Sequence, residues 1–157
     1  MALYDNGRAQ FTYHTNWFWA SFTYHNEQLN KDISINMGDG IGTEYTPENK
    51  QDKFYEDFIN IEGKLIKLDQ TDIEYDDKDM LKTHRFKTIS DNRVFKNRSC
   101  DFTFEPTGLA KDGLHIIILG ITQYLVYGFW SGVCEIDGQK IQFDQVLGTV
   151  EHVRARW

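Results

Sequence analysis

Glu151 is the ionisable residue whose position says most about possible chemistry. The segment 150–157 is predicted to form the last strand, and side chains alternate between the two faces of a strand. Glu151 therefore shares a face with Val153, Ala155 and Trp157. If this apolar face points inward, a carboxylate points at the core, where it must be paired or become an acid with a raised pKa. Two interpretations stay open: a structural carboxylate hydrogen-bonded near a barrel rim, or a catalytic acid–base group.

Trp17 and Trp19 also share one face of a predicted strand. Paired aromatic side chains on an inner wall could line a ligand cavity, although core packing is the commoner use of such residues. The sequence leaves both uses open.

No strong catalytic or cofactor motif is present. The run Gly38-Asp-Gly-Ile-Gly42 lacks the spacing and the Lys-Ser/Thr of a phosphate-binding loop, so we interpret it as a turn. The five histidines have no partner at metal-ligand spacing, which predicts no metal site, and no cofactor is expected. Cys100 and Cys134 are too few for a disulfide framework, so we expect two reduced, packed thiols rather than a bridge or a nucleophile.

The net charge of −7 argues against partners that present a phosphate backbone or an anionic membrane surface. The one basic cluster, His152, Arg154 and Arg156, lies on the face of the last strand opposite Glu151. The start of the chain has no basic segment followed by an apolar one, so we expect a cytoplasmic protein. The most apolar stretch, His115 to Trp130, falls short of the ~20 residues of a membrane-spanning helix, and we expect a buried strand there.

The elements that must position these residues are mostly strands. Aromatic residues make up 15% of the chain, and polar and apolar residues alternate in segments such as Asp32–Met37 and Asp101–Glu105. Glu62-Gly63 and Asp137-Gly138 predict tight hairpin turns. A loop containing Gly108 and Gly113, a turn near Gln123, and separate strands over 140–144 and 150–157 are expected in the second half.

About ten short strands and little helix indicate an antiparallel meander. A sheet of that length usually curls, so we expect a β-barrel, with a β-sandwich as the alternative. No linker or repeat interrupts residues 1–157, which predicts a single domain.

Several spaced motifs resemble the family of unknown function DUF2804. They are Asp5-Asn-Gly-Arg8, Trp17-Phe-Trp-Ala20, Asn36-Met-Gly-Asp-Gly-Ile-Gly42, Glu62-Gly63, Gly128-Phe-Trp-Ser-Gly132, Asp137-Gly138, Leu147-Gly-Thr-Val-Glu151 and Arg156-Trp157. Two positions depart from the family pattern: a Glu-Asn pair reads Glu56-Asp57 here, and a Gly-Arg-Gly reads Gly7-Arg8-Ala9. The resemblance implies a lipocalin-like barrel, distantly akin to hydroxyneurosporene synthase, that corresponds to the second half of a longer two-barrel protein.

The resemblance supports two functional hypotheses. The first is a binding or scaffold domain for an apolar small molecule, with candidate ligand contacts at Trp17, Trp19, Asn36, Trp130 and Arg154. The second is a hydratase or isomerase acting on such a molecule, with Glu151 and Glu56 as acid–base groups. In both cases we expect a homodimer or association with a missing N-terminal half, because a lone barrel would expose the surface that its companion covers.

Overall fold

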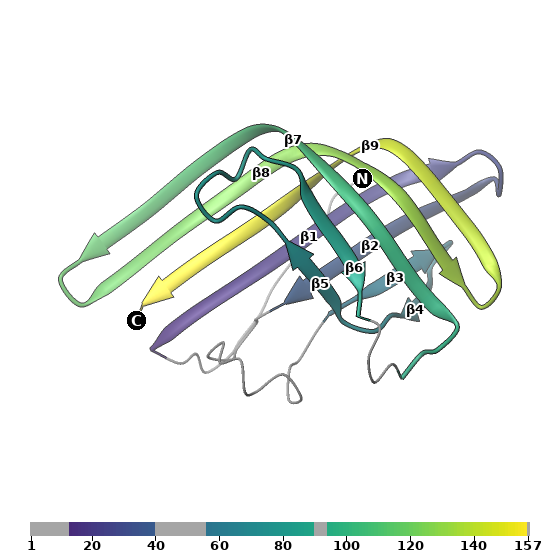
Figure 1. Ribbon diagram of the computed structural model, residues 1–157, viewed down its shortest axis with the longest axis horizontal. Coiled ribbons are helices and arrows are strands. Elements are labelled where there is room, and N and C mark those ends of the chain that lie inside the picture. The colour runs from purple at the N-terminus through teal and green to yellow at the C-terminus, as the bar shows by residue number, and fades with distance from the viewer. Residues whose placement is uncertain (1–12, 40–55, 90–93, 157) are drawn as a thin grey trace.

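The computed structural model describes residues 13–39, 56–89 and 94–156. In these residues the protein folds as a single curled antiparallel sheet (Figure 1). Its nine strands in the described residues are β1 (His14–Asn26), β2 (Lys31–Asp39), β3 (Phe58–Ile61), β4 (Lys64–Lys67), β5 (Thr71–Glu74), β6 (His84–Thr88), β7 (Arg98–Ile116), β8 (Leu119–Ile136) and β9 (Gln139–Arg156). They lie in the order β4-β3-β2-β1-β9-β8-β7-β6-β5. The sheet curls into a half-barrel, which confirms the predicted all-β, antiparallel fold. No helix in the described segments has the length and apolarity needed to cross a bilayer.

The concave side of the sheet holds the core. In β1, Phe18, Ala20 and Phe22 belong to the buried cluster, so alternation places Trp17 and Trp19 on the outer face. Trp130 of β8 is fully buried, and its ring centroid lies 4.7 Å from those of both Phe86 and Phe104, and 5.2 Å from that of Phe22. Aromatic packing of this kind fills the centre of the half-barrel.

The two predicted hairpin turns are present. Glu62 and Gly63 join β3 to β4 with φ of 51° and 82°, and Asp137 and Gly138 join β8 to β9 with φ of 51° and 87°. Positive φ at both central residues gives a turn whose twist matches that of the flanking strands.

The last three strands are longer than the sequence predicted. β7 runs without a break through Gly108 and Gly113, with only a bulge between Pro106 and Gly108, and Gln123 lies inside β8 rather than at a turn. β9 likewise joins into one strand, as far as Arg156, the two strands that were expected over 140–144 and 150–157. Each of these strands forms backbone hydrogen bonds with a neighbouring strand along its length. Glycine and polar residues can take part in such pairing, so they do not end the strands.

The far halves of β7 and β8 form an arm that projects beyond the core, together with the end of β9 and the start of β1 (Figure 1). The turn between β7 and β8 falls at Ile117 and Ile118, and Ile117 is 94% exposed. Leu114 and Ile116 are also exposed. The expectation of a buried strand beginning at His115 is therefore wrong for its first residues.

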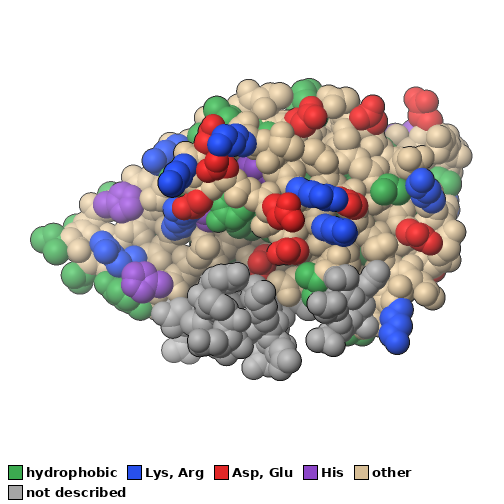
Figure 2. Space-filling model, in the orientation of Figure 1, with side chains coloured by type: hydrophobic (Ala, Val, Ile, Leu, Met, Phe, Trp, Pro, Cys, Tyr) green, Lys and Arg blue, Asp and Glu red, His purple; other side chains and the backbone are tan. Residues whose placement is uncertain are grey.

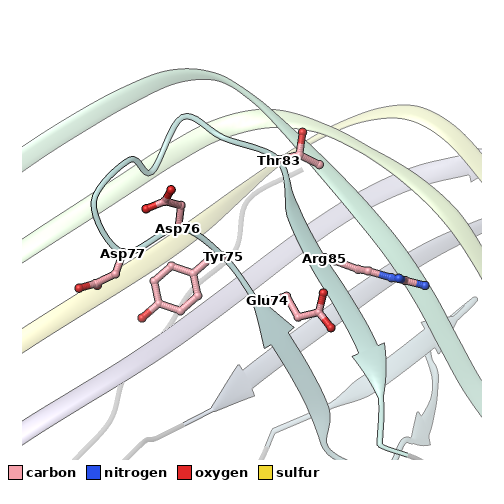
Figure 3. Close-up of a pocket in the computed structure, with 6 residues that line it drawn as sticks. All are labelled: Glu74, Tyr75, Asp76, Asp77, Thr83 and Arg85. Carbon is pink, nitrogen blue, oxygen red and sulfur yellow. The ribbon is translucent and has the colours of Figure 1, made fainter.

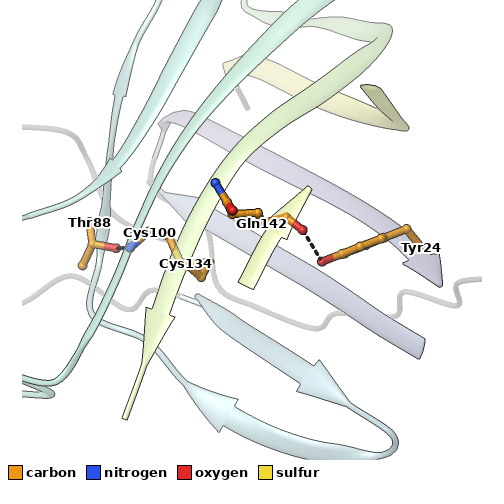
Figure 4. Close-up of a disulfide and its surroundings, with 5 residues drawn as sticks. All are labelled: Tyr24, Thr88, Cys100, Cys134 and Gln142. Carbon is orange, nitrogen blue, oxygen red and sulfur yellow. Dashed lines mark hydrogen bonds between the residues drawn. A yellow bond between two sulfur atoms is a disulfide. The ribbon is translucent and has the colours of Figure 1, made fainter. Parts of the chain in front are cut away.

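A disulfide joins Cys100 to Cys134, contrary to the prediction of two free thiols (Figure 4). The two residues are direct partners in the β7–β8 ladder, with Cα atoms 4.1 Å apart. Close pairing of this kind brings two sulfurs within bonding reach. The backbone N–H of Cys100 also donates to Oγ1 of Thr88, at 2.9 Å. The error arose because two cysteines 34 residues apart become neighbours only once the register is known.

The ends of the curled sheet are tied together by Asp57, which precedes β3. One carboxylate oxygen accepts a hydrogen bond from the N–H of Gly38 in β2 (3.1 Å), and the other accepts one from the N–H of Thr71 in β5 (3.0 Å). Burial raises the pKa of Asp57 to about 7. One buried side chain therefore bridges strands that belong to opposite ends of the sheet.

Candidate functional site

Two fully buried histidines lie on the concave side, near the point where the arm leaves the core. His84 comes from β6 and His152 from β9, and neither is exposed to solvent. His84 Nε2–H donates to the carbonyl oxygen of Met80, at 3.2 Å. His152 Nε2 lies 2.7 Å from Oδ1 of Asn16, to which it donates a hydrogen bond when the ring proton is on Nε2. The Nε–H of Arg154 points at the same nitrogen from 3.4 Å, a longer contact.

Each imidazole keeps one ring nitrogen without a partner. The carbonyl oxygen of Met80 and the shorter of the two contacts of His152, that with Asn16, assign the ring protons to Nε2, so Nδ1 presents a lone pair. Both Nδ1 atoms are buried and have no hydrogen-bond partner among the described residues. Burial lowers the pKa of His84, and burial followed by repulsion from His84 lowers the pKa of His152 to about 4. Both rings are therefore neutral hydrogen-bond acceptors at neutral pH.

Aromatic rings surround the histidine pair. Phe18 stacks on His152 with centroids 4.1 Å apart, and Tyr124 lies on His152 at 6.0 Å. Tyr75, just after β5, contacts both imidazoles edge-on, at 5.5 Å from His152 and 6.2 Å from His84. We call this group, His84, His152, Tyr75, Phe18 and Tyr124, the histidine cluster.

Tyr75 of the histidine cluster also lines an open pocket (Figure 3). The pocket has a volume of about 460 Å³ and is lined by Glu74, Tyr75, Asp76, Asp77, Thr83 and Arg85, from β5, β6 and the connection between them. Asp77 forms an ion pair with Arg154 of β9, so the β5–β6 connection is held against the strand that carries His152.

The sequence-predicted candidates divide between two places. Arg154 lies beside the histidine cluster and Trp130 lies in the core, where its Nε1 has no hydrogen-bond partner. Glu151 lies on the outer face instead, half-buried, and accepts a hydrogen bond from Nε2 of Gln123 at 2.7 Å. The expectation that the Glu151 carboxylate points at the core was wrong, because the core side of β9 carries Val150 and His152.

Trp19, Asn36 and Glu56 form a chain of contacts on the outer face. The Nε1 of Trp19 donates to Oδ1 of Asn36 at 2.8 Å, and Nδ2 of Asn36 donates to the backbone carbonyl of Glu56 at 2.9 Å. Trp17 lies on the same face. The structure thus brings together three of the predicted residues, but away from the histidine cluster.

Sequence reasoning missed His84, His152 and Tyr75. The signal for His84 was present in His-Arg-Phe-Lys-Thr, where it alternates with two charged residues and shares a face with Phe86. His152 was assigned to the face with Arg154 and Arg156, which looked solvent-exposed. That face is concave, and only its portion near the core is buried.

The fold and the cluster define an all-β half-barrel protein with a buried histidine pair on its concave side. A model of the family described as Domain of unknown function (DUF2804) matches residues 1–157, so the chain belongs to that family. No curated protein matches the chain.

One solved structure that resembles this chain comes from Nitrosomonas europaea and is provisionally named AttH. The two share 13% sequence identity with a TM-score of 0.45, over 99% of this chain and 57% of the other. The chain therefore spans little more than half the length of that protein.

Proposed function

We propose that this domain binds a small, largely apolar molecule that carries a hydrogen-bond donor, such as a hydroxyl group, at the histidine cluster. The observation that carries the proposal is the pair of fully buried imidazoles whose Nδ1 atoms lack a partner. An unsatisfied buried polar group costs about 1–3 kcal/mol, and most proteins avoid it. A ligand hydroxyl would satisfy such a nitrogen, while Phe18, Tyr75 and Tyr124 would contact the apolar body of the ligand.

The entry route in this proposal runs through the pocket beside Tyr75. Tyr75 lines the pocket and its ring also contacts both imidazoles, so a rotation of this one side chain would open a path from the pocket to the imidazoles. Side-chain rotations of this kind take place rapidly compared with ligand dissociation.

Thermal unfolding in the presence of 1-decanol, and of decane as the probe without a hydroxyl, tests the proposal. We expect decanol to raise the melting temperature of the wild type and of the surface control His25→Gln, but not of His152→Phe. The same shift with decane, or an undiminished decanol shift in His152→Phe, would overturn the proposal. Native mass spectrometry of the purified protein would show whether a ligand co-purifies.

A hydratase or isomerase remains the second candidate, and one observation favours it. The unprotonated imidazoles at the cluster could accept a proton from a bound molecule, as a general base must. Glu151 and Glu56, the acid–base candidates from the sequence, contact neither histidine through the hydrogen bonds described above. Incubation of a co-purified ligand in D₂O, followed by return to H₂O so that only carbon-bound deuterium is kept, tests this candidate: we expect the mass of the ligand to rise with wild-type protein and not with His152→Phe, and no rise with either would exclude it.

A further inference from the structure

The concave face of the arm is basic, although the chain as a whole is acidic. In the arm, β7, β8, β9 and β1 lie side by side, and side chains alternate between the two faces of each strand. This alternation places five basic residues on the same face as His152: His14, Lys111, His115, Arg154 and Arg156. The acidic residues of the arm, Asp112 and Glu151, fall on the opposite face. Figure 2 shows Lys, Arg and His side chains gathered over this arm, behind its apolar tip. With a net charge of −7, such a segregation concentrates positive potential at one place.

A hollow of about 250 Å³ lies within this basic face. Its lining includes His14, His115, Thr122, Arg154 and Arg156. The ring of His115 lies across the neighbouring strand, where its Nε2 is 3.0 Å from the hydroxyl of Thr122. Gly120 allows this position, because a Cβ there would lie 2.7 Å from the ring. Five of the residues that line the hollow therefore have side chains that can donate a hydrogen bond to an anion.

Two cations of this face have no carboxylate partner among the described residues. Arg154 pairs with Asp77, but Arg156 donates only to the carbonyl oxygen of Ile117, at 3.4 Å, and Lys111 lies over the ring of Tyr124, at 5.1 Å. A partly exposed guanidinium and an ammonium group in this arrangement can take up an oxyanion without breaking an ion pair.

We infer that the hollow binds the carboxylate or phosphate head of an anionic amphiphile whose other end reaches the histidine cluster; this inference rests on the proposed function. Arg156 and His152 lie on one face of β9, four residues apart, which corresponds to about 13 Å along a strand. The ligand class that fits both sites is a long-chain acid or phosphate with a hydroxyl group near its far end.

The test measures binding of 12-hydroxydodecanoate and of its uncharged methyl ester by isothermal titration calorimetry. For the wild type we expect the acid to bind about tenfold more tightly than the ester, as one charge-assisted hydrogen bond allows. In Arg156→Gln we expect this preference to disappear while the ester binds as before. The matched control, Lys87→Gln, removes one exposed positive charge elsewhere and should keep the preference.

The outcomes separate the two proposals. If the wild type binds acid and ester equally, the anion site is refuted while the histidine cluster stands. If it binds neither, the proposed function itself fails. Rising salt gives a readout that needs no variant: binding of the acid should weaken and that of the ester should not. Vesicles of phosphatidylcholine with phosphatidic acid present the same phosphate chemistry in a bilayer, and binding to these vesicles alone would overturn the inference of a free ligand.

Discussion

Among single residues, the cysteine pair gives the plainest prediction about stability. The disulfide closes a stretch with a sequence separation of 34 residues, and a loop of that size stabilises a folded protein by about 3–4 kcal/mol in the chain-entropy account. We expect reduction, or the Cys100→Ser/Cys134→Ser double variant, to lower the unfolding free energy by that order in urea titrations. Titration of two free thiols in denatured, unreduced protein would contradict the bridge.

Gly128 in β8 has a packing role. A Cβ on Gly128 would lie 2.3 Å from the carbonyl oxygen of Glu105 and 2.8 Å from the ring of Phe104, so β7 and β8 could not approach as they do. We expect Gly128→Ala to cost about 1–3 kcal/mol of stability, the usual cost of overpacking. Gly108→Ala is the control, because nothing lies within 4 Å of a Cβ there. Equal melting temperatures for the two variants would refute this explanation.

At the scale of elements, β9 is the strand on which the sheet most depends. It pairs with β1 on one side and β8 on the other over residues 148–156, and it lies at the middle of the strand order. We expect a chain that ends before Gly148 to be insoluble. The loss of this part of β9 would leave the backbone N–H and C=O groups of β1 and β8 unpaired along the edges that face it. A soluble product with an unchanged melting temperature would show that β9 is dispensable. Val153 of this strand is buried, and Trp157, which the sequence places on the same face, lies outside the described residues.

Some elements could be predicted from sequence because their signal is local. Asp137-Gly138 and Glu62-Gly63 define their turns by the conformations that these residues adopt, whatever lies around them. The length of a strand, and which of its faces points to the core, depend on residues that are distant in the sequence. The extent of β7 past Pro106 depends on its pairing with β8, and the core side of β9 depends on how the sheet curls. For the same reason the sequence indicated Arg154 as a candidate but not the two histidines beside it.

At the scale of the whole molecule, the outer face of the sheet carries apolar side chains that a second copy of the chain could cover. Trp17 and Trp19 lie half-buried there, together with the exposed Tyr127 and Leu147 on neighbouring strands. A second copy covering this face is our proposal for the homodimer, and light scattering at micromolar concentration should then give twice the single-chain 18.5 kDa. We expect Leu147→Lys to shift the mass toward the monomer. Leu81→Lys, at an exposed leucine in the β5–β6 connection, should leave it unchanged, and a monomeric wild type would refute the proposal.

Closure of the sheet by Asp57 makes the stability of the whole molecule depend on pH. The pKa of this carboxyl is raised from 3.8 to about 7, so between these values the folded protein holds a proton that the unfolded chain releases. Its contribution to stability is therefore complete below about pH 4 and is lost as the pH rises through 7. His152 acts in the opposite direction, because its lowered pKa makes the folded state less stable as the pH falls below 6.5.

The two effects can be separated with Asp57→Asn, which removes the titrating carboxyl and leaves His152 unchanged. We expect the unfolding free energy of the wild type, minus that of Asp57→Asn, to decrease steadily from pH 4 to pH 7 in urea titrations at fixed ionic strength. Contributions common to both proteins, including that of His152, cancel in this difference. A difference that stays constant across this range would mean that the carboxylate is ionised throughout, with the N–H groups of Gly38 and Thr71 sufficient to hold its charge between the two ends of the sheet.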